Sequence, residues 1–226
     1  MKRLFILVTL IIVSVSDCSK GECIEGNCEN GKGTYVRSDG AIYIGEWKNG
    51  KRDGYGVEDS EENNYDGYFK ENYWDGKGKW IWKTTNMVYE GTFKKGELDG
   101  IGKQIDMNGT IYIGNFIEGK AEGYGEVYEK NGNIFKGQFK NDRRYGHGIL
   151  VFGDKKRKRR IGNWYNGSFC VEGDCLGGYG KVILPKSYSY EGNLKEGWPE
   201  GKGILKDKEG KVVHEGEFRN GNPIKG

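Results

Sequence analysis

Four of the five cysteines form two matching units, and thiols at this spacing can form a disulfide or bind a metal. The units are Cys23-Ile-Glu-Gly-Asn-Cys28 and Cys170-Val-Glu-Gly-Asp-Cys175. Each unit places its cysteines across a turn sequence, where a hairpin can bring two Cα atoms within about 4.4–6.8 Å, the range of a disulfide. A single four-cysteine metal site would need two distant units to meet. We therefore predict the pairs Cys23–Cys28 and Cys170–Cys175, and no metal.

The fifth cysteine, Cys18, follows a segment typical of a secretory signal peptide. Two basic residues precede an apolar run from Leu4 to Val15. A helix of a dozen residues spans about 18 Å, which is too short for a bilayer core of about 30 Å. Val15-Ser16-Asp17-Cys18 resembles a bacterial lipobox, which would place lipid on Cys18; ordinary cleavage after Ser16 is the alternative. Lipid on Cys18 leaves an even number of cysteines for pairing, which favours the lipoprotein.

A dense block of positive charge is a candidate binding site for an anion. The run is Lys155-Lys156-Arg157-Lys158-Arg159-Arg160. It can attract anionic lipid headgroups, to which each basic residue contributes about 1 kcal/mol near a membrane, or an acidic polysaccharide. It can equally be a solvated turn beside an edge-like strand, where charge discourages aggregation.

Neither catalysis nor nucleotide binding is indicated by the remaining polar residues. His147 and His214 lie inside repeat units, and no pair of a nucleophile and a base recurs. The segment from Gly114 to Lys120 has the spacing of a phosphate loop, but neither Ser nor Thr follows it. The net charge of +3 is too small to indicate nucleic-acid binding. We therefore expect no enzyme, no cofactor, no small-molecule substrate and no nucleic-acid partner.

Glycine dominates the composition and restricts the fold class. The chain has 40 glycines and three prolines among 226 residues, so glycine is roughly 18% against about 7% in an average protein. A Gly-X-Y period is absent, which excludes collagen. Aromatic residues make up 13%, which excludes a disordered chain. Since an interior glycine costs a helix about 1 kcal/mol relative to alanine, the composition predicts strands.

The glycines recur with aromatic residues in units of roughly 23 residues. Most units have aromatic-x-Gly-x-aromatic, then a turn and Gly-x-Gly, and weaker units replace one ring with Arg160, Leu194 or His214. Period-two alternation places both rings and the glycine on one face of a strand, and the turn reverses the chain, so each unit predicts a β-hairpin. The units with both rings are Tyr43-Ile-Gly45-Glu-Trp47, Tyr65-Asp-Gly67-Tyr-Phe69, Tyr89-Glu-Gly91-Thr-Phe93, Tyr112-Ile-Gly114-Asn-Phe116 and Phe135-Lys-Gly137-Gln-Phe139.

The pattern Tyr-x-Gly-x-(Trp/Phe)-x-x-Gly-x-x-x-Gly-x-Gly resembles the MORN (membrane occupation and recognition nexus) repeat. Tyr43 to Gly56 and Tyr112 to Gly125 match it at every fixed position. The resemblance implies an all-β, solenoid-like fold of consecutive hairpins in an elongated, mostly single-layer antiparallel sheet. About 16 strands would form a rod of roughly 75 Å. We expect a signal peptide at 1–17 and a repeat domain at 18–226, with about eight hairpin units and an insertion near 165–180.

These features predict a non-enzymatic repeat scaffold that is secreted or held in the cell envelope, lipid-anchored through Cys18. One accessible sheet face would bind a protein partner or a second copy. The alternative is a peripheral module that binds membrane lipid or anionic polysaccharide through the run 155–160. A hydrolase acting on cell-wall material is a third interpretation, but it would need sequence outside the repeats.

Overall fold

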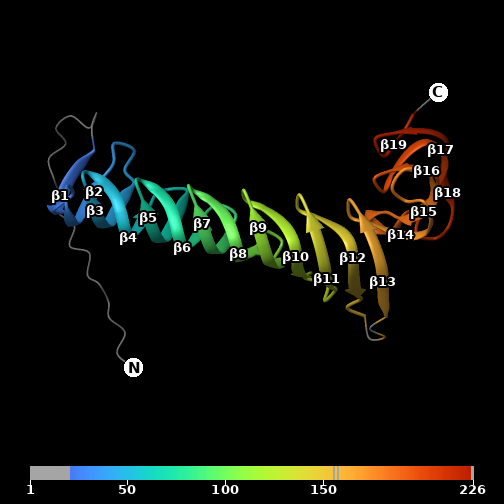
Figure 1. The fold of residues 1–226 in the computed structure, drawn as a ribbon, viewed down its shortest axis with the longest axis horizontal. Helices are drawn as coiled ribbons and strands as arrows, with labels where there is room; N and C mark the ends of the chain where they lie inside the picture. Colours follow the sequence, from blue (N-terminus) through green and yellow to red (C-terminus); the bar gives the residue numbers. More distant parts are fainter. Residues whose placement is uncertain (1–20, 155, 157, 225–226) are drawn as a thin grey trace.

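The computed structural model describes residues 21–154, 156 and 158–224, which form one antiparallel sheet of 19 strands joined hairpin to hairpin. This confirms the predicted all-β fold. Strands β1 to β13 follow one another along the rod, and the later strands form a more compact group at its C-terminal end (Figure 1). The elements are β1 Glu22–Gly26, β2 Gly31–Val36, β3 Ile42–Lys48, β4 Lys51–Asp59, β5 Asn63–Lys70, β6 Tyr73–Trp82, β7 Met87–Lys94, β8 Glu97–Ile105, β9 Ile111–Ile117, β10 Lys120–Tyr128, β11 Ile134–Lys140, β12 Arg143–Val151, β13 Arg159–Tyr165, β14 Ser168–Gly173, β15 Tyr179–Ile183, the 3-10 helix η1 Pro185–Ser187, β16 Ser189–Lys195, β17 Trp198–Lys206, β18 Val212–Arg219 and β19 Asn222–Pro223.

The strands number 19 rather than about 16 because the cysteine hairpins β1–β2 and β14–β15 add strands to those of the repeat units. The insertion expected near 165–180 contains β14 and the turn that follows it.

The repeat hairpins close with two-residue turns in which both residues have positive φ. Asn49 and Gly50, for example, have φ of 51° and 68°. Such turns match the twist of the strands that they join. Asn72 and Asp142 stand where other turns have glycine, with φ of 76° and 66°. Their side-chain oxygens accept backbone N–H groups of the preceding hairpin, at 2.9 and 2.8 Å, which ties one turn to the next.

One glycine from each of the strands β1 to β18 lies in a row that crosses the sheet in two stretches. We call this the glycine row, and its members pair directly with one another from strand to strand. The first stretch is Gly26, Gly33, Gly45, Gly56, Gly67, Gly78, Gly91, Gly102, Gly114, Gly125, Gly137, Gly148 and Gly162. The second is Gly173, Gly180, Gly192, Gly203 and Gly216.

Close contacts with an aromatic ring or with the paired backbone explain why this row is glycine, and Tyr43 gives the clearest example. A Cβ on Gly45 would lie 2.4 Å from the hydroxyl of Tyr43 and 2.6 Å from the Cα of Gly56. The Tyr43 ring therefore lies over a glycine pair, and its hydroxyl donates to the Glu46 carbonyl at 3.0 Å. The same hydrogen bond to the carbonyl three residues on is made by Tyr65, Tyr112 and Tyr190.

The first glycine of each Gly-x-Gly bends the returning strand. In hairpin β3–β4, Trp47 pairs with Arg52 while Gly45 pairs with Gly56, so the returning strand bulges between these pairs. Gly54 lies in this bulge with φ of 108°, a conformation that favours glycine. On its other side it pairs with Phe69 of the next hairpin. The bulge therefore bends the strand beside an aromatic residue of the next repeat.

Aromatic rings on the inner face form the core and link successive repeats. The Phe69 ring lies 4.9 Å from Tyr43 and 5.1 Å from Tyr65, edge to face in both cases. Phe139 bridges Tyr112 and Phe135 in the same way, at 5.0 and 5.4 Å. Edge-to-face pairs add about 0.5–1.5 kcal/mol each beyond the area that they bury. The rings replace the second layer that a sheet otherwise needs.

The sheet divides into two parts at β13 and β14. These strands share only the residue pairs Trp164–Phe169 and Tyr165–Ser168, next to their turn. The glycine row is therefore interrupted between Gly162 of β13 and Gly173 of β14. The buried residues form two clusters, one from Tyr43 to Trp164 and the other from Cys175 to Phe218. Each part therefore has its own core.

We predict that Gly67→Ala lowers the free energy of unfolding by about 2–3 kcal/mol, because overpacking forces the backbone to move. The new Cβ would lie 2.5 Å from the Gly78 Cα and 2.7 Å from the Lys77 carbonyl oxygen. Gly177→Ala is the matched control, since its Cβ would have no atom within 4 Å and its φ is not positive. Urea denaturation followed by circular dichroism measures both variants. Equal stability of the two would contradict the steric role of the glycine row.

Candidate functional site

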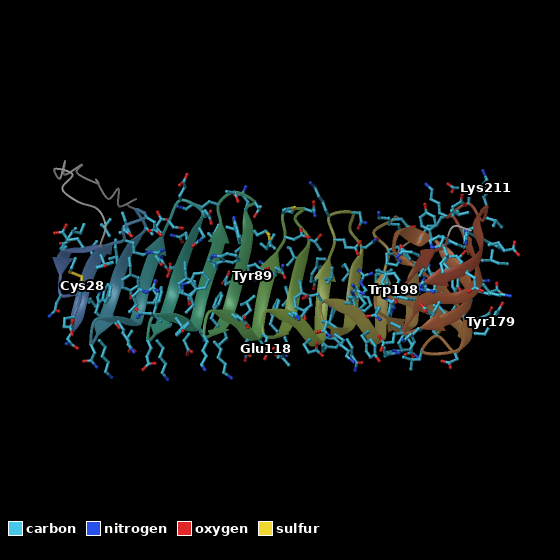
Figure 2. All side chains as sticks on the ribbon, turned by 90° about the horizontal axis from the view of Figure 1, so that it is seen from above. Cys28, Tyr89, Glu118, Tyr179, Trp198 and Lys211 are labelled. Carbon is cyan, nitrogen blue, oxygen red and sulfur yellow. A yellow bond between two sulfur atoms is a disulfide. The ribbon has the colours of Figure 1, made fainter. Side chains whose placement is uncertain are left out.

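Both predicted cysteine pairs are disulfides, and they occupy equivalent positions at the start of the two parts of the sheet. Cys23–Cys28 and Cys170–Cys175 have Cα–Cα distances of 6.0 and 5.9 Å. In each hairpin a bulge follows the first cysteine, and a Gly–Gly pair then opens the glycine row. The Cys23–Cys28 disulfide is visible beside the Cys28 label in Figure 2. The cysteine unit is therefore one structural element used twice. Cys18 lies outside the described residues.

The basic run 155–160 divides between solvent and core. Lys156, Lys158 and Arg159 are exposed, whereas Lys155 and Arg157 lie outside the described residues. Arg160 differs from the exposed members, because its guanidinium carbon lies 5.3 Å from the Phe152 ring and 5.1 Å from the Phe169 ring. Burial lowers the pKa of Arg160. It occupies the first aromatic position of its repeat and stacks there in place of a ring.

The aromatic residues singled out in the repeats lie mainly in the core. Tyr43, Tyr65, Phe69, Phe93, Tyr112, Phe116, Phe135 and Phe139 are buried, and Trp47 packs against them. Tyr89 departs from the pattern: it is half-buried, and its hydroxyl accepts a hydrogen bond from Gln104 at 2.9 Å. Figure 2 labels it near the middle of the rod. These side chains hold the sheet together and leave the opposite, outer face free.

The outer face carries a trough that runs along the rod over the glycine row. It is shallow and open to solvent, spans β4 to β9 with a volume of about 680 Å³, and has the backbone of Gly67, Gly78, Gly91 and Gly102 as its floor. One wall, from successive paired strands, is Asp66, Lys79, Glu90, Lys103 and Ile113. The other wall is Tyr55, Tyr68, Lys77, Thr92 and Ile101. A second hollow of about 420 Å³ over β1 to β4 shares Tyr55 and extends the trough toward the N-terminal end.

The middle residue of each Gly-x-Gly projects from the outer face. Tyr55, Ile101, Tyr124 and Tyr179 are exposed to 47%, 76%, 63% and 63%. Each stands between two glycines, which leaves its side chain accessible. Figure 2 shows Tyr179 projecting from the C-terminal part of the rod. The repeat therefore keeps its interior residues nearly constant, whereas the side chain presented between the two glycines changes from hairpin to hairpin.

Tyr55 and Tyr68 form an aromatic pair at one end of the trough. They face each other across β4 and β5, with ring centroids 5.6 Å apart. The Tyr55 hydroxyl donates to the Asp66 carboxylate in the facing wall. This hydrogen bond raises the pKa of Tyr55. The pair is held in place before any ligand arrives.

A recurring acidic residue before Gly-x-Gly also has a defined role, which we did not predict from the sequence. Glu122 and Glu200 accept the N–H of the first turn residue of the next hairpin, at 2.9 and 2.8 Å. Asp53 and Asp75 make longer contacts of the same kind. In the sequence these residues recur as Asp/Glu-Gly-x-Gly with the period of the repeat. These carboxylates are structural and lie at the tight-turn edge, marked by Glu118 in Figure 2, opposite the loop edge marked by Lys211.

Other candidate chemistry is sparse. His147 is exposed on the outer face, and His214 packs edge to face on Phe218 at 4.9 Å. Within residues 21–154, 156 and 158–224, no group of three His, Cys, Asp or Glu side chains is placed to hold a metal. No helix in the same residues is long and apolar enough to span a membrane.

Burial raises the pKa of the tyrosines that cover the glycine row. The pKa rises to about 12 for Tyr112 and Tyr190, and that of Tyr43 and Tyr65 is also raised. Removal from water disfavours the phenolate, so the folded state keeps these hydroxyls protonated. They remain hydrogen-bond donors at physiological pH.

We predict that stability falls as pH rises from about 10 to about 12. Unfolded tyrosine ionises near pH 10, so over this interval the unfolded state binds fewer protons than the folded state, and rising pH stabilises the unfolded state relative to the folded one. Urea denaturation at successive pH values measures the fall. Tyr112→Phe should reduce the slope by up to about 1.4 kcal/mol per pH unit. Phe135 shows that a ring without a hydroxyl fits this position. An unchanged slope in Tyr112→Phe would contradict the prediction.

Comparison with known protein families matches the MORN repeat at residues 29–42, 43–63, 65–87, 89–111, 112–133, 135–157 and 190–212. These segments cover about two thirds of the chain. No curated protein matches the chain.

Among solved structures, one similar chain is the wild-type TCP10 domain of Danio rerio CPAP in complex with a peptide of Danio rerio STIL. It has 14% identity and a TM-score of 0.38, over 83% of this chain and 84% of that chain. Another is the SAS-4 (dCPAP) TCP domain in complex with a proline-rich motif of Ana2 (dSTIL) of Drosophila melanogaster. It has 11% identity and a TM-score of 0.34, over 91% and 96% of the two chains.

Proposed function

Because this chain belongs to the family of MORN-repeat proteins, we propose that it is a non-enzymatic repeat scaffold that binds an extended segment of a protein partner in the trough of its outer face. Repeat proteins commonly bind along an extended surface made by successive units. The observation that carries the proposal is the trough over β4 to β9, with presented side chains on both walls. A linear segment would contact several repeats at once.

The distribution of burial supports this assignment. The inner face is filled by aromatic rings, so a partner reaches side chains mainly on the outer face. Ile101 and Ile113 are exposed to 76% and 42%, which leaves apolar surface on both walls. The basic run is a weaker candidate, because Arg160 is engaged by Phe152 and Phe169. The trough therefore offers the more complete site.

Photocrosslinking tests the binding face. A benzoylphenylalanine in place of Ile101 should give a discrete adduct with a partner protein, because this side chain stands in the trough. Met107, which is exposed to 62% in a loop outside the trough, is the matched control position and should give none. Equal labelling from both positions, or none from Ile101, would count against the trough.

We further propose that the scaffold works outside the cytoplasm and is lipid-anchored through Cys18. The two disulfides support an oxidising compartment, because cytosolic thiols are normally kept reduced. The apolar run before Cys18 supports export, and an even number of cysteines remains if Cys18 carries lipid.

Intact mass of the native protein tests the anchor. We expect a chain that begins at Cys18 with the added mass of a diacyl or triacyl glyceryl group. Reduction should add about four hydrogens, as two disulfides require. A chain that begins with an unmodified Asp17 would rule out the lipoprotein and leave ordinary secretion.

A further inference from the structure

We propose that the segment bound in the trough is proline-rich and acidic, and that it lies along the rod as a polyproline II helix. The inference rests on the proposed function, because it names the partner of the same trough. Three observations carry it: the spacing of the presented side chains, the aromatic pair at one end, and the lysines of the walls.

The spacing comes from the strands. Equivalent side chains of successive hairpins are two strands apart, about 9.6 Å at 4.8 Å per strand. A polyproline II helix has three residues per turn and rises 3.1 Å per residue, so its side chains recur on one face every 9.3 Å or so. Each turn of such a ligand therefore meets one hairpin. The helix also has no internal hydrogen bonds, and the strands beneath it have already used theirs in the sheet, so the contacts would come from side chains.

The aromatic pair supplies the proline site. Tyr55 and Tyr68 are exposed to 47% and 50%, and the hydrogen bond to Asp66 holds the Tyr55 ring across one end of the trough. Proline-rich segments bind aromatic-lined grooves, where their preformed helix loses little conformational entropy on binding. A fixed aromatic pair reduces the cost of binding on the protein side as well.

The lysines in the walls of the trough favour acidic residues at the remaining positions of the ligand. Lys77 and Lys79 stand on β6 and Lys103 stands on β8, and none of the three makes an ion pair among the described residues. The wall carboxylates are Glu90 and Asp66, and the latter accepts the Tyr55 hydroxyl. Strands β6 and β8 are one hairpin apart, so acidic residues three positions apart in the ligand would face both groups of lysines.

Fluorescence anisotropy with synthetic peptides tests the proposal on the full chain with both disulfides intact. The probe is a fluorescein-labelled (Glu-Pro-Pro)4 peptide, in which every glutamate lies on one face of the helix. The register control is (Glu-Pro-Pro-Pro)3, which keeps the helix but turns successive glutamates away from one another. The second control is (Glu-Gly-Ser)4, which keeps the spacing but not the helix. We expect binding of the probe and at least about tenfold weaker binding of both controls.

Two variants with exposed substitutions locate the binding. One variant combines Lys79→Gln with Lys103→Gln, and the other carries Tyr68→Ala. Each should lower the affinity for the probe about tenfold, since exposed ion pairs and interface aromatic residues contribute on this scale. Lys211→Gln, at the far loop edge, should leave the affinity unchanged. Circular dichroism verifies that each variant is folded.

Equal affinity for the three peptides, or equal affinity of the trough variants and wild type, would overturn the proposal. Failure of the probe to bind would overturn it too. In that case the Ile101 crosslink still decides whether the trough holds a different kind of protein segment, so the two proposals fail separately.

Discussion

The contact of a tyrosine ring with a pair of cross-strand glycines is the interaction on which the rest of this structure depends. At Gly45 and Gly56 the ring of Tyr43 occupies the space that a Cβ would fill, and its hydroxyl reaches the backbone beyond. The same ring packs edge to face with Phe69 of the next hairpin. A sheet of one layer thus acquires a core from its own side chains, and the glycines are what let the rings lie close enough.

The limits of the glycine row set the organisation of the molecule. The row stops at β13 and β14, where two residue pairs join the strands, and the core divides at the same place. The Cys170–Cys175 hairpin opens the second part as Cys23–Cys28 opens the first. At such an opening the aromatic contacts of a preceding repeat are missing or reduced. A disulfide across the turn supplies local stability there, on the order of 2 kcal/mol for a short loop.

The inner face of the sheet packs the core and the outer face presents accessible side chains, which explains how a sheet of this kind can serve as a scaffold. Rings on the inner face are committed to packing, so changes there affect stability. The middle residue of Gly-x-Gly makes few contacts on the outer face, and it is tyrosine, isoleucine, lysine or histidine in different hairpins. Binding specificity can therefore vary from repeat to repeat without disturbing the core.

The sequence by itself determined the repeat, the hairpins, the all-β class and the cysteine pairs, because each depends on residues close together in the chain. Period-two alternation, turn glycines and a five-residue cysteine spacing are local signals. Only the tertiary structure decided that the glycines align in one row, that Arg160 stacks on Phe152 and Phe169, and that wall residues from six strands form a trough. These depend on the register of the strands, which the bulge at Gly-x-Gly shifts within a hairpin and which continues without a shift from one hairpin to the next. The register is fixed by rings packing across repeats, a contact that no single unit of the sequence contains.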